Sequence, residues 1–173
     1  MGMIHVYHGD GKGKTTAAVG LALRALGNGY RVTLVQFFKG QASGEIRLLQ
    51  AMEGVTILRP TSGAKFTWQM DAPEAALLKA EHGAMLAQAD VALQSGACDL
   101  LILDEALGAA AYGFLEPDAL LRLVRGKPEA PELVLTGRSP APEILALADY
   151  VTEMVKIKHP FDAAIPARAG VEF

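Results

Sequence analysis

A glycine-rich loop near the start of the chain constrains this sequence more than any other feature. The loop runs from Gly9 to Thr16 and reads Gly-Asp-Gly-Lys-Gly-Lys-Thr-Thr. It follows the apolar segment 3–7 and precedes the helix-forming segment 17–26. Strand, glycine-rich loop and helix in this order form a cradle for phosphate, because the loop N–H groups converge on one anion and the helix N-terminus adds a favourable dipole. The sequence therefore predicts a phosphate site at this loop.

The side chains of the loop have distinct expected roles. Lys14, which we expect to be exposed, would reach phosphate oxygens, and the Thr15 hydroxyl would bind Mg²⁺. The spacing departs from the nucleotide-binding pattern G-x-x-x-x-G-K-[ST], because His8 stands where its first glycine belongs. The alternating glycines add backbone freedom and indicate that the triphosphate is seated in an unusual way. The dinucleotide pattern G-x-G-x-x-G also fails at Lys14, and a glycine-rich surface loop is the alternative to a phosphate cradle.

Composition and length favour a single cytoplasmic domain. At 173 residues the chain has the usual size of one domain, so we expect residues 1–173 to form one unit. The lone cysteine, Cys98, excludes an internal disulfide framework and suits a reducing compartment. No apolar run reaches the ~20 residues that span a bilayer, and no signal peptide is recognisable. A net charge of −3 argues against general nucleic-acid binding.

Beyond the loop, apolar strand-like segments alternate with helical ones. Further strands are expected at 31–37, 55–58, 99–103, 132–136 and 150–157, and further helices at 45–52, 72–94 and 141–148. Asp71, Pro73 and Glu74 have the spacing of a capped helix start. His82 on that helix is expected to be a core or boundary residue rather than a metal ligand. The alternation predicts an α/β fold with a doubly wound, mostly parallel sheet flanked by helices.

Charged residues follow two of the expected strands. Asp104 and Glu105 come directly after the apolar run 100–103, which resembles a Walker-B element that orders Mg²⁺ beside a nucleotide. Ligands bind at the carboxyl ends of parallel strands, so both carboxylates are predicted to hold the metal or to order a water. Arg138 follows the next strand at the same edge, and is either a solvated charge or, as we favour, a phosphate clamp.

Several separated blocks of the sequence carry a family resemblance. They are the loop 9–16, Val35–Gly40, Phe66-Thr67-Trp68, Leu103-Asp104-Glu105, Thr136-Gly137-Arg138, and the segments 157–162 and 167–172. In this order, and over nearly the whole chain, they resemble the ATP:corrinoid adenosyltransferases of the bacterial cobalamin pathway. The resemblance implies a RecA-like P-loop NTPase fold and a homodimer. It also implies transfer of the 5′-deoxyadenosyl group of ATP to Co(I) of a corrinoid, with release of inorganic triphosphate.

The resemblance further implies a set of site residues. ATP would contact Gly9, Asp10, Gly11, Lys12, Gly13, Lys14, Thr15, Thr16 and Arg138. Thr15, Asp104 and Glu105 would hold Mg²⁺, with Lys14 and Glu105 as the catalytic residues. Phe66 and Trp68 would shield the lower face of the corrin and so ease the reduction of Co(II) to Co(I). A reductase or flavodoxin would supply the electron.

Two departures from the family pattern lead to further expectations. Asp10 replaces the asparagine common in the family, so its carboxylate should point away from the phosphates or toward the metal. Many members carry an N-terminal extension that folds over the active site, whereas the first strand here begins near residue 3. Another segment, or the corrin itself, should therefore cover the site.

The chemistry also separates this reaction from its alternatives. Co(I) is a strong nucleophile, so attack on the ribose 5′-carbon needs no protein base, and the protein must position the reactants and stabilise the departing triphosphate. One alternative is a P-loop ATPase or kinase that cleaves at the γ-phosphate, with Glu105 activating the acceptor. Another is a non-catalytic nucleotide-binding regulator. Neither accounts for the Phe-Thr-Trp block or the segment 159–162.

Overall fold

The computed structural model describes residues 1–40, 43–62 and 67–171. Within these residues, six strands form one sheet in the order β3-β2-β4-β5-β1-β6. The strands are β1 (Ile4–His8), β2 (Val32–Gln36), β3 (Val55–Leu58), β4 (Leu100–Asp104), β5 (Glu132–Thr136) and β6 (Tyr150–Glu153). The helices are α1 (Lys14–Leu26), α2 (Gly44–Gln50), α3 (Ala72–Gln94), α4 (Ala106–Ala111), α5 (Pro117–Arg125) and α6 (Pro142–Leu147), with 3₁₀ turns η1 (Thr67–Gln69) and η2 (Pro160–Ala163). Each paired strand runs parallel to its neighbour.

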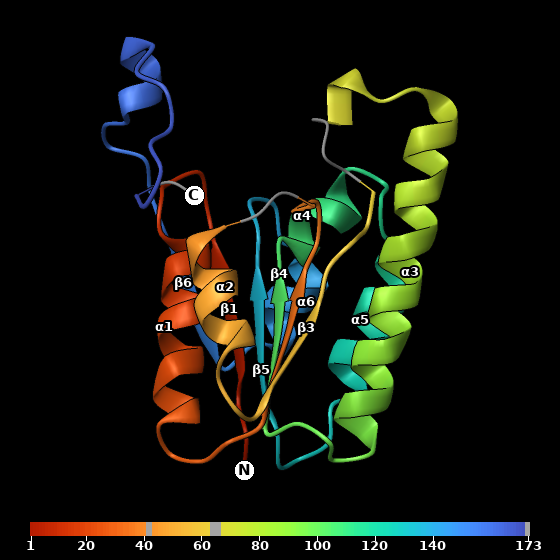
Figure 1. Cartoon of the computed structure of the whole chain (residues 1–173). Helices are drawn as coiled ribbons and strands as arrows, with labels where there is room; N and C mark the ends of the chain where they lie inside the picture. The colour runs from red at the N-terminus through yellow and green to blue at the C-terminus, as the bar shows by residue number, and fades with distance from the viewer. Residues whose placement is uncertain (41–42, 63–66, 172–173) are drawn as a thin grey trace.

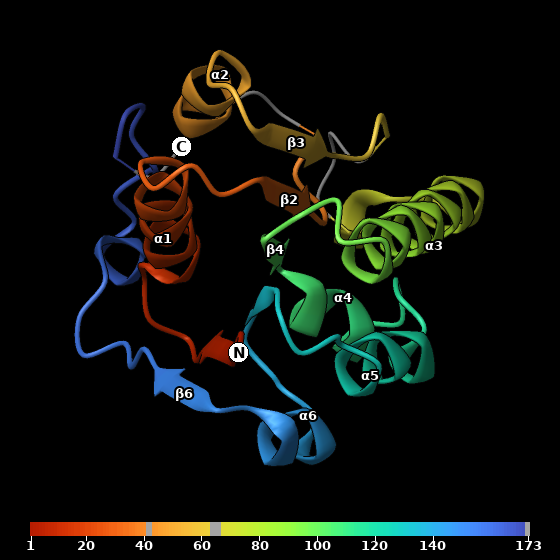
Figure 2. The same cartoon turned by 90° about the horizontal axis from the view of Figure 1, so that it is seen from below.

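Helices cover both faces of the sheet (Figure 2). The helices α1 and α2 lie on one face, and α3 to α6 lie on the other. Successive strand residues alternate between the two cores: Leu34 and Ile102 pack with α1 and α2, whereas Val35 and Leu103 pack with the opposite layer. Strands buried on both faces are continuously apolar, as residues 100–103 of β4 are. The predicted doubly wound α/β sheet is confirmed.

The carboxyl ends of the strands meet at the upper edge in Figure 1. The glycine-rich loop joins β1 to α1 there, and Asp104 ends β4 at the same edge. Arg138 lies just beyond the end of β5, which separates β1 from β4. The turns η1 and η2 extend past this edge on opposite sides of the molecule (Figure 1). The fold therefore gathers the predicted phosphate and metal residues at one edge.

Some elements differ from the expected ones. Helix α1 begins at Lys14 rather than at residue 17, because the loop runs directly into the first helical turn. Strand β6 ends at Glu153 rather than at residue 157, because its partner β1 ends at His8 and the two residues form the last pair. The helices α4 and α5 were not predicted, and α4 is only six residues long and buried over most of its length, so it shows no amphipathic period. No helix in the described ranges is long and apolar enough to cross a membrane.

Helix α3 confirms two predictions. The Asp71 carboxylate accepts a hydrogen bond from the Glu74 N–H, and the Glu74 side chain accepts one from the Asp71 N–H, which completes a capping box. His82 is fully buried in the core. Its Nε2 accepts from the Phe38 N–H at 3.2 Å, so Nδ1 carries the proton and donates to the Phe114 carbonyl at 3.2 Å. Burial lowers the pKa of His82 to about 4.

The buried His82 makes the stability of the fold depend on pH. An unfolded histidine takes up a proton below about pH 6.5, whereas the native one stays neutral down to about pH 4. Its contribution to the free energy of unfolding is therefore present at pH 7 and lost as the pH falls. Between pH 7 and 5 we expect the wild type to lose about 2 kcal/mol more than His82→Gln, measured by urea denaturation. Equal losses in the two proteins would contradict the neutral, buried histidine.

Candidate active site

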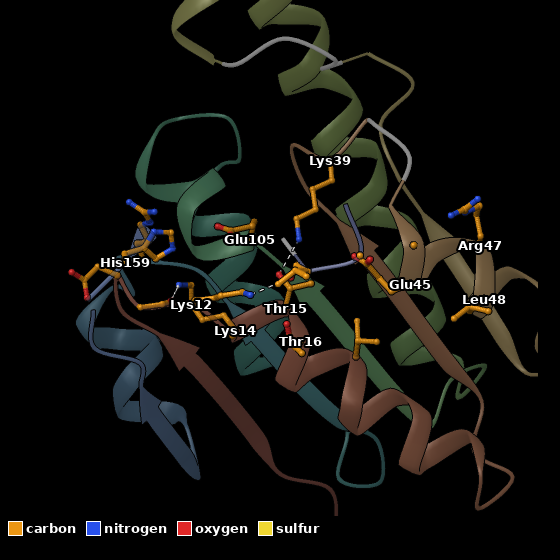
Figure 3. A pocket seen from close by; sticks show the side chains of 18 residues that line it. Lys12, Lys14, Thr15, Thr16, Lys39, Glu45, Arg47, Leu48, Glu105 and His159 are labelled. Carbon is orange, nitrogen blue, oxygen red and sulfur yellow. Dashed lines mark hydrogen bonds between the residues drawn. The ribbon is translucent and has the colours of Figure 1, made fainter. Parts of the chain in front are cut away.

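A cavity of about 1020 Å³ lies over the glycine-rich loop at the carboxyl edge of the sheet (Figure 3). This volume is at the upper end of the range of small-molecule sites. Its walls come from the loop, from α2 and from the C-terminal segment. The predicted residues that line it are Asp10, Gly11, Lys12, Gly13, Lys14, Thr15, Thr16, Glu105 and Arg138. The structure thus brings together around one cavity nine of the residues that the sequence assigned to ATP and the metal.

The alternating glycines of the loop are explained by a close approach to the chain after β6. A Cβ at Gly11 would lie 2.6 Å from the carbonyl oxygen of Met154, which accepts a hydrogen bond from the Gly11 N–H at 2.7 Å. Gly9 meets the same carbonyl and has a φ of 102°, a conformation that side chains disfavour. Both positions therefore need glycine for contact with the 154 segment as well as for the loop turn.

The expectation that Lys14 is exposed was wrong. Its residue surface is only 8% exposed, and its ammonium donates to the carbonyls of Gly9 at 2.8 Å and Gly11 at 2.7 Å. These two hydrogen bonds hold the side chain folded back over the loop. Burial lowers the pKa of Lys14 below its usual value. Lys14 is thus a positive charge held inside the loop, next to the cavity.

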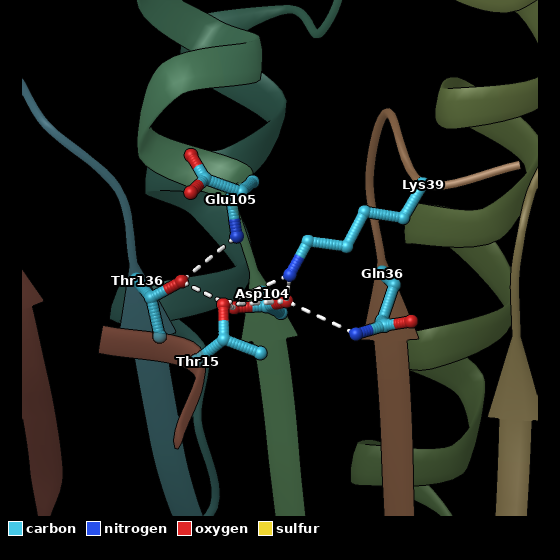
Figure 4. Close-up of polar contacts among 6 residues, drawn as sticks. All are labelled: Thr15, Gln36, Lys39, Asp104, Glu105 and Thr136. Carbon is cyan, nitrogen blue, oxygen red and sulfur yellow. Dashed lines mark hydrogen bonds and ion pairs between the residues drawn. The ribbon is translucent and has the colours of Figure 1, made fainter. Parts of the chain in front are cut away.

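Asp104 lies at the centre of a hydrogen-bond network behind Thr15 and Lys39, which line the cavity (Figure 4). Its side chain is fully buried. It accepts from Thr15 Oγ1 at 2.9 Å, Thr136 Oγ1 at 2.7 Å, Gln36 Nε2 at 3.2 Å and Lys39 Nζ at 2.8 Å. A hydroxyl and a carboxylate side by side are the hard oxygen ligands that Mg²⁺ prefers. The Thr15 hydroxyl and the Asp104 carboxylate therefore suit the predicted Mg²⁺. The Lys39 ammonium beside them shows that these two oxygens attract a cation.

Glu105 connects β4 to α4 in a conformation unusual for a residue other than glycine. Its φ is 62°, and its N–H donates to Thr136 Oγ1 at 2.9 Å. Such strain is characteristic of functional sites. Burial raises the pKa of the Glu105 carboxyl above its usual value, and the neighbouring Asp104 charge acts in the same direction. Across the described ranges, no group of three or more His, Cys, Asp or Glu residues is arranged to hold a metal, so any metal here needs Thr15 or the nucleotide as further ligands.

Lys39 was missed as a site residue, although the block 35–40 was part of the resemblance. Its ammonium lies 2.8 Å from Asp104 Oδ2 and 2.9 Å from Thr15 Oγ1, and its side chain lines the cavity. The signal was present in the sequence, because a lysine three residues after a fully buried strand falls at the carboxyl edge of the sheet. Gln36 and Thr136, the last residues of β2 and β5, were missed in the same way.

The C-terminal segment forms one wall of the cavity. Lys12 Nζ donates to the Val171 carbonyl at 3.1 Å, and His159 and Gly170 line the same space. The Asp10 carboxylate accepts from the Lys156 N–H at 3.0 Å, which lowers the pKa of Asp10. The Asp10 carboxylate therefore points toward the C-terminal segment, although the residue also lines the cavity, and its orientation relative to the phosphates or the metal remains a prediction. A segment distant in sequence does cover part of the loop.

Trp68, the described residue of the aromatic pair, lies apart from the loop (Figure 1). Trp68 belongs to η1, and 77% of its residue surface is exposed, so it is not a core aromatic residue. Phe66 lies outside the residues that the structure describes. Arg138 is exposed at the rim of the cavity, where it remains a predicted phosphate clamp. The assignment of Phe66 and Trp68 to the corrinoid also remains a prediction.

A solved structure with a similar fold supports the architecture. The flagellar accessory protein FlaH from Methanocaldococcus jannaschii superposes with a TM-score of 0.52 at 15% identity, over 87% of this chain and 70% of that one. At this identity the likeness concerns the fold alone. It agrees with the doubly wound α/β sheet predicted from the strand alternation.

Sequence comparison identifies the family. The family model described as ATP:corrinoid adenosyltransferase BtuR/CobO/CobP matches residues 1–173. The corrinoid adenosyltransferase of Pseudomonas aeruginosa is 38% identical over 99% of this chain and 84% of its own length. That of Salmonella typhimurium is 38% identical over 99% of this chain and 86% of its own length. The chain therefore belongs to the ATP:corrinoid adenosyltransferase family, whose members move the adenosyl group of ATP onto a corrinoid.

Proposed function

We propose that this chain seats the triphosphate of ATP on the loop 9–16, so that a Co(I) corrinoid displaces all three phosphates together from the ribose 5′-carbon. The observation that carries the proposal is the cavity itself. Lys12, Lys14 and Arg138 border it with positive charge. Thr15 lines it, and the buried Asp104 lies behind Thr15, with a carboxylate oxygen 2.9 Å from the Thr15 hydroxyl. Positive charge that is already in place before the reaction stabilises a leaving group that becomes more negative as its bond to carbon breaks. The cobalt–carbon bond forms as the carbon–oxygen bond breaks, and that electron pair leaves with the triphosphate.

Magnesium is part of this proposal. Thr15 and Asp104 would hold the ion, with Glu105 at its side, and the ion would neutralise charge on the triphosphate. Lys14 would move from the carbonyls of Gly9 and Gly11 to phosphate oxygens, because an anion binds an ammonium more strongly than neutral carbonyls do. Burial and Asp104 raise the pKa of Glu105, and the bound cation would favour the ionised form of this carboxyl.

The aromatic block would act on the corrinoid rather than on ATP. Phe66 and Trp68 would cover the lower face of the corrin and exclude its axial ligand, which favours reduction of Co(II) to Co(I). The exposure of Trp68 supports this role, because a side chain that packs no core remains available to a large substrate. A reductase or a flavodoxin would deliver the electron.

The functional unit would be a cytoplasmic homodimer of single-domain subunits. The edge strand β6 and the chain after it expose Tyr150, Val151, Val155, Ile157 and Phe161. An exposed apolar edge of this kind is commonly covered by a partner, and a second copy would bury it. The single free cysteine, Cys98, supports a reducing compartment. Sedimentation equilibrium measures the oligomeric state directly.

The product of the reaction tests the proposal. Anaerobic incubation with ATP, Mg²⁺ and a Co(I) corrinoid should give adenosylcorrinoid and inorganic triphosphate in equal amounts, without ADP. Phosphorus NMR distinguishes these products, because a γ-phosphoryl transfer leaves ADP whereas attack at carbon leaves the three phosphates joined. Stoichiometric ADP without a cobalt–carbon bond would favour the ATPase or kinase alternative, which the family match does not support.

A further inference from the structure

The ammonium of Lys39 lies at the point where Mg²⁺ is proposed to bind. It donates to Asp104 Oδ2 at 2.8 Å and to Thr15 Oγ1 at 2.9 Å (Figure 4). These are the carboxylate and the hydroxyl assigned to the metal. A cation that contacts both oxygens cannot remain there when a second cation binds to them, because two positive charges at this separation repel strongly.

Lys39 also compensates for a buried negative charge in the fold. Asp104 is fully buried, and a buried carboxylate is costly unless its charge is compensated. Within the part of the chain that the structure describes, the other side chains that donate to it are neutral: Thr15, Thr136 and Gln36. The ion pair to Lys39 therefore supplies the compensating charge.

The position of Lys39 lets it leave this ion pair without unfolding the site. It follows Phe38, whose φ of 64° turns the chain out of the sheet just after β2. Its side chain is 33% exposed and lines the cavity, whereas that of Asp104 is inaccessible. A lysine has a flexible four-carbon stem and a mobile point charge. The ammonium can thus swing from Asp104 into the space proposed for the triphosphate.

We propose that Lys39 is an internal counter-ion that occupies the metal position in the metal-free protein and exchanges with Mg²⁺ when the nucleotide binds. The inference rests on the proposed Mg²⁺ site. In the metal-free state Lys39 neutralises Asp104 and weakens the binding of a bare divalent ion. When Mg²⁺ enters with ATP, the displaced ammonium finds a new partner in the triphosphate. Metal and nucleotide therefore favour each other's binding through one lysine.

The variant Lys39→Met tests the exchange, because it keeps the length of the stem and removes the charge. Mn²⁺, a paramagnetic substitute for Mg²⁺, is titrated without nucleotide and followed by electron paramagnetic resonance. We expect Mn²⁺ to bind Lys39→Met about tenfold more tightly than the wild type, because the competing charge is gone. Asp104→Asn should abolish this binding and so locate the ion. Lys79→Met, which removes the 2.8 Å surface pair to Glu116, is the matched control and should leave the Mn²⁺ affinity unchanged.

Thermal denaturation in the presence of a chelator gives a second readout. Lys39→Met should have a lower Tm than the wild type, since Asp104 loses its counter-ion, and added Mn²⁺ should restore that Tm. The double variant Lys39→Met/Asp104→Asn removes both charges and should be more stable than Lys39→Met. It also provides the test if the single variant fails to fold: recovery of a folded double variant supports the counter-ion, and failure of both variants to fold overturns it.

Two results separate this inference from the proposed function. Mn²⁺ binding at Asp104 that is equal or weaker in Lys39→Met than in the wild type would overturn the exchange, while the metal site and the adenosyl transfer would stand. Formation of ADP instead of triphosphate would contradict the proposed reaction, whatever the behaviour of Lys39. Unchanged Tm in Lys39→Met with chelator would likewise exclude the counter-ion role.

Discussion

Replacing Lys14 with alanine is expected to lower kcat/KM for ATP by about a thousandfold, the scale on which a fixed donor to developing negative charge acts. The ammonium already lies within the loop, 2.8 Å from the Gly9 carbonyl and 2.7 Å from that of Gly11. It needs only to change partners when the triphosphate arrives. Anaerobic adenosylation with prepared Co(I) corrinoid measures the loss. Because Lys14 is buried, Lys14→Met should be made as well, to keep the packing of the stem and remove the charge alone.

A second lysine provides a matched control for this prediction. Lys127 also donates to two backbone carbonyls, those of Gly2 and Pro128, each at 2.8 Å, but it lies at the opposite edge of the sheet. Lys127→Ala should lose comparable stability and keep its activity. Normal nucleotide affinity and turnover in both Lys14 variants would contradict the phosphate cradle. A parallel loss of activity in Lys127→Ala would attribute the effect to stability instead.

Replacing Trp68 with alanine is expected to slow adenosylation about a hundredfold when the enzyme starts from bound Co(II), which corresponds to about 3 kcal/mol of barrier. With chemically prepared Co(I) the loss should be much smaller, because the ring is proposed to assist reduction and not the attack on carbon. Trp68 lies in η1 with 77% of its surface exposed, so circular dichroism should remain native-like. Phe66→Ala carries the same expectation.

The comparison of the two starting states is itself the main control. Equal losses from Co(II) and from Co(I), with native folding, would exclude the role in reduction. Tyr30→Ala removes another exposed aromatic side chain, but from the turn before β2, at the edge remote from the cavity. It should behave as the wild type in both assays. A loss in Tyr30→Ala would indicate a general effect of removing surface aromatic residues.

Local signals in the sequence were sufficient for much of the fold. The bounds of β3 and β5 agree with the structure, and the capping box at Asp71 and Glu74 fixed the start of α3. These features depend on neighbours within a few residues. The end of β6 depends instead on where β1 ends, a partner more than a hundred positions earlier in the chain. The apolar pattern of one strand carries no information about where its partner strand ends, so the predicted strand 150–157 was too long.

The site residues divide in the same way, into those that the local sequence predicts and those that depend on contacts between distant segments. The loop 9–16, Asp104 and Arg138 were found because each follows a strand whose carboxyl end is recognisable. The burial of Lys14 was not predicted, since it depends on how the loop carbonyls turn inward. The sequence could place Lys39 at the carboxyl edge, but not its ion pair with Asp104, which forms only because β2 and β4 pair and bring Gln36 next to Asp104. To predict which side chains meet across neighbouring strands, the order of the strands in the sheet must be known. The apolar pattern of the sequence does not give that order.

The place of β1 in the sheet has a consequence for how the protein is made. This first strand lies between β5 and β6, and Ile4 pairs with Leu133 while His5 pairs with Tyr150. During synthesis the loop leaves the ribosome early, yet the strands that hold it in shape leave last. Non-local pairing of this kind slows folding, and an unpaired apolar strand is prone to aggregation in the meantime. The loop 9–16 should therefore be among the last parts of the nascent chain to acquire protection from hydrogen exchange.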